Sequence, residues 1–180
     1  MRVFTLLFAF VFFGSIFGQA QTSPNNRVSP LDSIRYVEED MKVEIVYSRP
    51  YLKGREFGKD IVPYGKVWRT GANEATVFET NQDIVIEGKV LAAGKYSLYS
   101  IPGPEETVVI FNKDWNQWGT LYNEANDALR VTVPTVIIDE VAEQFTIQLD
   151  ENGTACLNWG QAFFAFQIEK DKKENSTILN

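Results

Sequence analysis

Short hydrophobic segments that alternate with turn residues constrain the fold of this chain more than any other feature of its sequence. In the segment 41–48, Met41, Val43, Ile45 and Tyr47 alternate with mostly polar neighbours, as in a strand with one buried face. Similar segments follow at close spacing through most of the chain. Such a series is typical of antiparallel sheets, in which tight turns join neighbouring strands.

Turn residues separate the expected strands. Glu87-Gly88 and Asn152-Gly153 each suit a hairpin turn, and Pro134 indicates a bulge or a sheet edge. The expected strands cover residues 41–48, 84–86, 89–91, 95–101, 107–112, 129–133, 136–138, 145–149, 154–159 and 162–168. The segment 118–129 is the helical candidate. We therefore predict an all-β protein, an antiparallel β-sandwich of about nine short strands with at most one short helix.

The first 20 residues have the features of a signal peptide. Arg2 precedes an apolar run over residues 3–13 that is too short to span a bilayer comfortably, and small residues at Gly18 and Ala20 suit a signal peptidase. A buried core helix is the alternative. We expect cleavage near Ala20, export to the periplasm or the cell surface, and no membrane span in the mature chain. The remaining segments are expected to be a flexible leader (21–32), a single domain (33–169) and a charged tail (170–180).

The composition excludes several classes of function. The chain has no His and one Cys, so it cannot build Ser-His-Asp or Cys-His nucleophile systems, HExxH zinc sites or an internal disulfide. The sequence also lacks a DxDxDG calcium loop, and we expect neither a metal site nor a cofactor. The net charge of −7 disfavours nucleic-acid binding, because such binding depends on neutralising phosphates with Lys and Arg.

Cations are concentrated in the segment 49–76, although the chain as a whole is acidic. This segment holds six cations and three acids, so it carries +3, whereas the rest of the mature chain is near −11. A positive patch of this kind steers an anionic ligand. Arg suits bidentate recognition of carboxylate or phosphate, and flat aromatic rings can stack on a sugar ring. The candidate ligand-binding residues are Arg49, Lys53, Arg55, Tyr64, Trp68, Arg69, Asn73 and Glu74.

Binding of an anionic or carbohydrate ligand by a non-catalytic module is the favoured interpretation, and three others stay open. The cations can instead brace the domain by pairing with its own carboxylates, with Arg69 and Glu74 as one pair and Asn73 bonded to the loop backbone. The segment can dock on another envelope protein, as in an assembly or accessory protein. It can also serve a hydrolase with Glu74 as acid or base and Arg69 as oxyanion partner, although a neighbouring Arg lowers the pKa of a carboxyl and makes it a poor base.

Several sequence blocks resemble one family of exported bacterial proteins. They are SRP (48–50), KGR (53–55), FG (57–58), VPYG (62–65), VWRTGANEAT (67–76), AGKYSL (93–98) and IFNK (110–113). On the order and spacing of these blocks, the chain resembles the domain of unknown function 2911 from residue 30 to about residue 168. The resemblance implies an exported single domain of β type. It transfers no catalytic residue, and Gly160 stands where family members commonly carry an acid after the late Trp.

Overall fold

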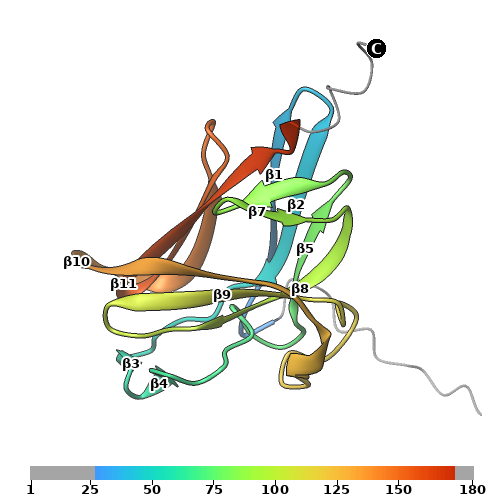
Figure 1. Cartoon of the computed structure of the whole chain (residues 1–180). Coiled ribbons are helices and arrows are strands. Elements are labelled where there is room, and N and C mark those ends of the chain that lie inside the picture. Colours follow the sequence, from blue (N-terminus) through green and yellow to red (C-terminus); the bar gives the residue numbers. More distant parts are fainter. Residues whose placement is uncertain (1–26, 173–180) are drawn as a thin grey trace, which may run out of the picture.

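The burial pattern of β2 (Met41–Ser48) shows why these residues form a strand. Met41, Val43, Ile45 and Tyr47 are almost fully buried, whereas the side chains between them are at least partly exposed. The computed structural model describes residues 27–172, in which such strands form an all-β sandwich (Figure 1). The predicted fold class is therefore confirmed.

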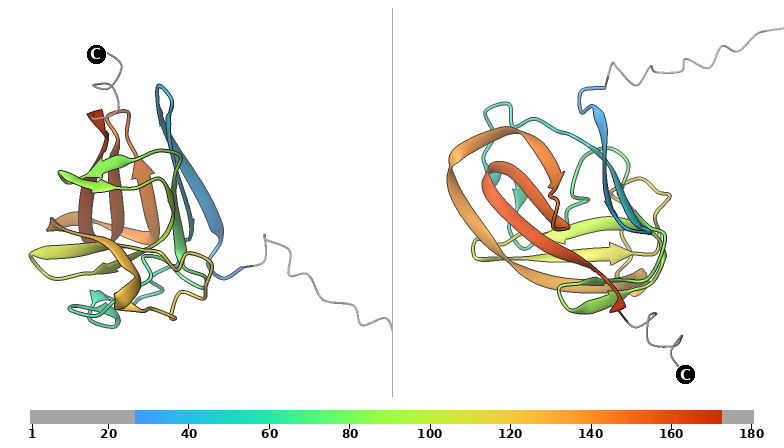
Figure 2. Two further views of the ribbon diagram at one scale, coloured as in Figure 1. Left: turned by 45° about the vertical axis from the view of Figure 1, so that its right-hand side comes forward. Right: turned by 90° about the horizontal axis from the view of Figure 1, so that it is seen from above.

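Nine strands hydrogen-bond into one antiparallel sheet that curls around a shared interior (Figure 2). Besides β2, the strands of the structure are β1 (Leu31–Glu38), β3 (Phe57–Gly58), β4 (Ile61–Pro63), β5 (Thr76–Thr80), β6 (Ile84–Ile86), β7 (Lys89–Leu91), β8 (Gly94–Ile101), β9 (Glu106–Asn112), β10 (Asp127–Leu149) and β11 (Thr154–Lys170). The order in the large sheet is β1-β2-β5-β8-β9-β10-β11-β6-β7, and β3 and β4 form a small parallel sheet.

Strand β10 belongs to both layers of the sandwich. Its residues 127–134 pair with β9, and its residues 135–149 pair with β11. The sequence predicts three separate strands here, interrupted at Pro134, but the structure shows one continuous strand in which Pro134 lies opposite Glu106. Register shifts in the part that pairs with β11 bend the strand. Strand β11 is likewise continuous where the sequence predicts two strands.

The structure also differs from the sequence prediction in other elements, because β1, β3, β4 and β5 are not among the expected strands. Strand β1 begins at Leu31, within the segment 21–32 that we expect to be a leader. The predicted helix over residues 118–129 is wrong, because only Glu124–Asn126 form a 3-10 helix and the next residue already begins β10. Among residues 27–172, no helix is long and apolar enough to cross a membrane.

Both predicted hairpin turns are confirmed. Glu87 and Gly88 join β6 to β7 with φ angles of 48° and 75°, which is the left-handed conformation that a two-residue hairpin turn requires. In the turn between β10 and β11, the side chain of Asp150 accepts hydrogen bonds from the N–H groups of Asn152 and Thr154 at 2.9 and 2.7 Å. These bonds satisfy the turn backbone where the sheet ends.

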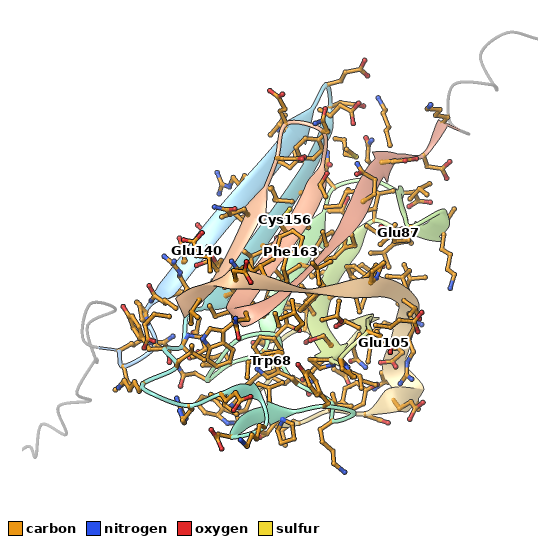
Figure 3. The ribbon with its side chains drawn as sticks, turned by 90° about the vertical axis from the view of Figure 1, so that its left-hand side faces the viewer. Trp68, Glu87, Glu105, Glu140, Cys156 and Phe163 are labelled. Atoms are coloured by element: carbon orange, nitrogen blue, oxygen red, sulfur yellow. The ribbon has the colours of Figure 1, made fainter. Side chains whose placement is uncertain are left out.

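Aromatic rings fill the core at the end of the sandwich that carries the segment 49–76. Trp68 stacks on Trp159 with centroids 5.5 Å apart, and Phe145 of β10 meets Trp68 edge-on at 5.0 Å. Phe57 of β3 also meets Trp68 edge-on, with ring centroids 5.8 Å apart. Trp68 lies at the lower end of the molecule in Figure 3. This cluster joins the loops to the sheet and so positions the candidate site.

Candidate functional site

The segment 49–76 crosses one end of the sandwich, below β8 and β9 in Figure 1, and backbone hydrogen bonds hold it there. The N–H of Leu52 donates to the carbonyl of Glu143 at 2.8 Å. Trp68 and Ser100 exchange two bonds of 2.7 and 2.8 Å, which attach the loop to β8. The side chains of the segment therefore project from a backbone fixed to both layers.

Arg49 braces the sandwich. Its Nε donates to the carbonyl of Phe145 at 3.1 Å and its Nη2 donates to Oγ1 of Thr146 at 2.8 Å. Its Nη1 lies 3.3 Å from Oδ2 of Asp32 in β1. All three guanidinium nitrogens thus bond to β1 or β10, and Arg49 lines none of the pockets described below. This geometry matches the bracing alternative for Arg49 rather than ligand binding.

Trp68 belongs to the core and does not offer an open stacking face. Its side chain is only 8 % exposed, and its Nε1 donates to the carbonyl of Gly71 at 3.0 Å. The stacked indole of Trp159 covers one face of the ring. A sugar ring therefore cannot stack on Trp68 as the sequence predicts, and only the small exposed part of the indole contributes to the pockets.

Glu74 pairs with Arg27 and not with Arg69. Two nitrogens of the Arg27 guanidinium bond to the two carboxylate oxygens of Glu74, the Nη1–Oε2 distance being 3.0 Å. The hydrogen bond from Arg27 lowers the pKa of Glu74 below its ordinary value. Within the part of the chain that the structure describes, the expected Arg69–Glu74 pair does not form. A carboxyl with a lowered pKa is also a weak proton acceptor.

Arg69 and Asn73 pack over Gly119. Asn73 has a left-handed φ of 62°, and its carbonyl accepts a hydrogen bond from the N–H of Gly119 at 3.1 Å. The same carbonyl lies 3.5 Å from Nη1 of Arg69. A Cβ atom at position 119 would lie 2.3 Å from Cδ of Arg69, so glycine leaves room for the Arg69 side chain. Asn73 therefore accepts these hydrogen bonds with its backbone carbonyl, whereas the sequence predicts a hydrogen bond from its side chain.

Lys53, Arg55 and Tyr64 lie on the outer loops of the segment. Arg55 donates from Nε to the carbonyl of Leu52 at 2.8 Å and from Nη2 to that of Tyr51 at 2.9 Å. These bonds fix the direction of the guanidinium, while its Nη1 has no hydrogen-bond partner among residues 27–172. Lys53 is exposed in a turn, and Tyr64 is half-buried.

Arg55, Lys66 and Arg69 line a single pocket of about 360 Å³, which we call the basic pocket. No acid lines this pocket, and none of the three cations has a carboxylate oxygen within 4.0 Å among residues 27–172. The rest of the lining is mainly apolar or aromatic: Ser29, Pro50, Ile61, Val62, Pro63, Val67, Trp68, Gly71, Ala72 and Trp159. Three cations without carboxylate partners therefore face one partly apolar recess.

Two further pockets adjoin the basic pocket. The acidic pocket measures about 530 Å³ and shares Arg55 with it. The acidic pocket is lined by Leu52, Gly54, Arg55, Glu56, Phe57, Asp60, Tyr64, Ile137, Val141, Glu143, Gly160, Gln161 and Ala162. The tyrosine pocket measures about 280 Å³ and shares Trp68 and Arg69 with the basic pocket. The tyrosine pocket is lined by Val67, Trp68, Arg69, Tyr99, Gly119, Thr120 and Tyr122.

The two tyrosines that line the tyrosine pocket are uncharged at neutral pH. Burial raises the pKa of Tyr122 to about 12, and the hydrogen bond to Asp127 adds to this effect. The Tyr122 hydroxyl lies 2.7 Å from Oδ2 of Asp127 and accepts a bond of 2.7 Å from Arg130. Burial likewise raises the pKa of Tyr99. Apart from Arg69, this pocket therefore has an uncharged lining near neutral pH.

The sequence does not single out Lys66 and Trp159 as site residues. Lys66 contributes to the +3 of the segment, but nothing in its local sequence separates it from Lys59, which pairs with Glu56 at 3.2 Å. Trp159 lies on β11 and reaches the pocket only because the sheet brings β11 next to β10. A local sequence pattern does not contain that information.

Together, fold and site define a β-sandwich domain with a basic, partly aromatic recess at one end. In the described part of the chain, no group of three or more acidic or cysteine side chains is placed to hold a metal ion. The sequence matches the model of the protein family of unknown function DUF2911 over residues 29–168, and the chain belongs to this family. The expected resemblance is thus confirmed. No curated protein and no solved structure is found to match the chain.

Proposed function

We propose that this protein is an exported binding module that holds a small anionic group in the basic pocket. The observation that carries the proposal is the convergence of Arg55, Lys66 and Arg69 on a recess with no acid in its lining. Cations without a carboxylate partner among residues 27–172 keep their charge and part of their hydrogen-bonding capacity for a ligand, and charge-assisted bonds to carboxylate or phosphate are the strongest of their kind.

Preorganisation also supports anion binding at this place. The carbonyl groups of Tyr51 and Leu52 hold the guanidinium of Arg55, and Gly119 supports Arg69. A ligand therefore does not have to order these side chains when it binds, which lowers the entropic cost of association. The apolar walls from Trp68 and Trp159 reduce the local dielectric constant and strengthen the attraction between opposite charges.

Export is the second element of the proposal. It rests on the apolar run and the small residues of the segment 1–20, which lies outside the described residues. When the full chain is produced in a bacterial host, we expect the protein in the periplasmic or extracellular fraction with Gln21 as its first residue. N-terminal sequencing of the purified protein checks this result. A cytoplasmic chain that retains Met1 would contradict it.

Tryptophan fluorescence provides a direct test of anion binding. Trp115 and Trp118 are 40 % and 51 % exposed, so a Trp115→Phe/Trp118→Phe chain keeps only the two pocket indoles as reporters. We expect titration with inorganic pyrophosphate or citrate to change this fluorescence. Lys66→Gln or Arg69→Gln should raise the Kd roughly tenfold or more, because each removes a charge-assisted bond of about 1.5–3 kcal/mol.

Lys59→Gln is the matched control for these variants. It removes one positive charge from the same segment, but Lys59 pairs with Glu56 and does not line the basic pocket. If it weakened binding as much as Lys66→Gln, the anions would be attracted by the general field and not held by the pocket. Absence of any response to phosphate, pyrophosphate and citrate would overturn the proposal.

The geometry does not favour the other candidate functions. Glu74, the acid or base of the hydrolase alternative, is engaged by Arg27 and lies outside the lining of the three pockets. Arg69 points over Gly119 instead of toward Glu74. Docking on another envelope protein stays a prediction that no specific contact surface supports.

A further inference from the structure

The basic pocket adjoins the acidic pocket on one side and the tyrosine pocket on another, because it shares lining residues with each of them. Arg55 is common to the acidic and basic pockets, while Trp68 and Arg69 are common to the basic and tyrosine pockets. A cation therefore stands at each junction. The pocket volumes of about 530, 360 and 280 Å³ exceed what one carboxylate or phosphate group fills. A ligand that uses the whole recess must extend beyond a single anionic group.

The acidic pocket determines what that extension can be. Glu56, Asp60 and Glu143 line it, and each already accepts one bond that orients its carboxylate. The donors of these bonds are Nζ of Lys59 at 3.2 Å, the N–H of Glu56 at 3.0 Å and the N–H of Lys53 at 2.9 Å. A carboxylate has about four acceptor positions, so others remain open. Such a lining repels a dense polyanion and accepts hydrogen bonds from hydroxyl groups.

Tyr64 gives the acidic pocket an aromatic wall with a free polar end. The Tyr64 ring packs directly on Gly58: a Cβ atom at position 58 would lie 2.3 Å from Cζ of Tyr64. This close packing fixes the position of the ring. The Tyr64 hydroxyl and the exposed side chain of Gln161 have no hydrogen bond to any residue in the range 27–172. Ile137 and Val141, 56 % and 57 % exposed, add apolar surface beside them. Aromatic, apolar and hydroxyl-binding groups side by side match the alternating C–H and O–H surface of a sugar.

We propose that the ligand is an acidic oligosaccharide. One acidic sugar places its carboxylate or sulfate between Arg55, Lys66 and Arg69. The neighbouring sugar is uncharged and lies in the acidic pocket, where its hydroxyls bond to the carboxylates, Gln161 and Tyr64. This inference rests on the proposed function of the basic pocket and adds the class of molecule that the pocket binds.

The test compares an acidic tetrasaccharide that has uncharged sugars between its acidic ones with smaller, uncharged and fully charged relatives. Isothermal titration is performed with a tetrasaccharide in which glucuronic acid alternates with N-acetylglucosamine, with its methyl ester, with glucuronic acid monomer and with tetragalacturonic acid. We expect the alternating tetrasaccharide to bind roughly tenfold or more tightly than the monomer, because its uncharged sugar gains the acidic-pocket contacts. Tetragalacturonic acid should gain less, because it places a second carboxylate beside the acids of that pocket. Methyl esterification should weaken binding of the alternating tetrasaccharide by roughly tenfold or more, because it removes the charge that the basic pocket neutralises.

Variants separate the two pockets. Tyr64→Phe/Gln161→Ala keeps the Tyr64 ring that packs on Gly58 but removes two hydrogen-bonding groups. It should weaken tetramer binding roughly three- to tenfold and weaken monomer binding less. Arg69→Gln should weaken the binding of the tetramer and of the monomer to a similar extent. A circular-dichroism melting curve for each variant shows that the fold is intact.

The outcomes distinguish this inference from the proposal on which it rests. If pyrophosphate binds in an Arg69-dependent way but the alternating tetrasaccharide binds no more tightly than the monomer, the oligosaccharide assignment fails while the anion site stands. The oligosaccharide assignment also fails if the methyl ester binds as tightly as the acid. If neither pyrophosphate nor any acidic sugar binds, both proposals fail.

Discussion

Trp68→Ala is expected to lower the free energy of unfolding by about 3–5 kcal/mol, the range for truncating a large buried aromatic residue. The substitution removes the ring that stacks on Trp159 and that Phe57 and Phe145 contact edge-on. It also leaves the carbonyl of Gly71 without the bond from Nε1. Because this cluster holds the loop segment against the sheet, the variant should lose anion binding as well. Urea denaturation followed by far-ultraviolet circular dichroism measures the change.

Two variants control this measurement. Trp68→Phe keeps an aromatic ring in the cluster and should lower the free energy of unfolding clearly less than Trp68→Ala does. Trp115→Ala removes an indole that is 40 % exposed and lies under Nζ of Lys95 at 5.2 Å, so its cost should be about 1 kcal/mol or less. Equal losses for Trp68→Ala and Trp115→Ala would contradict the core position of Trp68.

Gly58→Ala is expected to destabilise the protein by about 2–5 kcal/mol and to displace Tyr64. Gly58 has a φ of 85°, in the left-handed region where a side chain costs about 1–2 kcal/mol. Its Cβ would also stand 2.3 Å from Cζ of Tyr64, and overpacking of this kind costs about 1–3 kcal/mol. The free energy of unfolding reports the total cost. Weaker binding of an acidic tetrasaccharide reports the displaced ring.

Gly54→Ala isolates the steric contribution. Gly54 has a similar φ of 75°, but a Cβ at this position would meet no atom within 4 Å. This variant should therefore show only the backbone strain, about 1–2 kcal/mol, partly offset because alanine also restricts the unfolded chain. If the two variants were equally stable, the contact between Gly58 and Tyr64 would not be tight in solution.

The sequence predicts a strand well where burial marks one of its faces. In β2 the alternation of buried and exposed positions is visible in the residue types. The segment 139–144 of β10 lacks that signal, because its side chains are exposed or only partly buried and backbone pairing alone continues the strand. Strand β1 is also largely exposed, so its sequence resembles a polar leader. A strand that is held mainly by backbone hydrogen bonds does not require particular side chains, so its residue types do not identify it.

The position of the candidate site could be predicted, but most of its composition could not. The charge of the segment 49–76 depends on local residues and points to the end of the sandwich that carries the basic pocket. Which charged side chains stay available for a ligand depends on partners that are distant in the sequence. Arg49 bonds to Thr146, 97 residues away, and Glu74 pairs with Arg27, 47 residues away. Only the folded chain shows that Arg49 and Glu74 are engaged in ion pairs, while Arg55, Lys66 and Arg69 have no carboxylate partner in the range 27–172.

The double role of β10 has a consequence for how the chain folds. The hydroxyl of Tyr47 in β2 donates to the carbonyl of Ile147 and accepts from its N–H, across a sequence separation of 100 residues. The first hairpin, β1–β2, therefore completes its packing only after the last hairpin, β10–β11, has formed. Domains dominated by such distant contacts fold in milliseconds to seconds, slowly for their size. A nascent chain that lacks β10 and β11 cannot form these two bonds, and the edges of β9 and β6 that pair with the final strands stay unpaired.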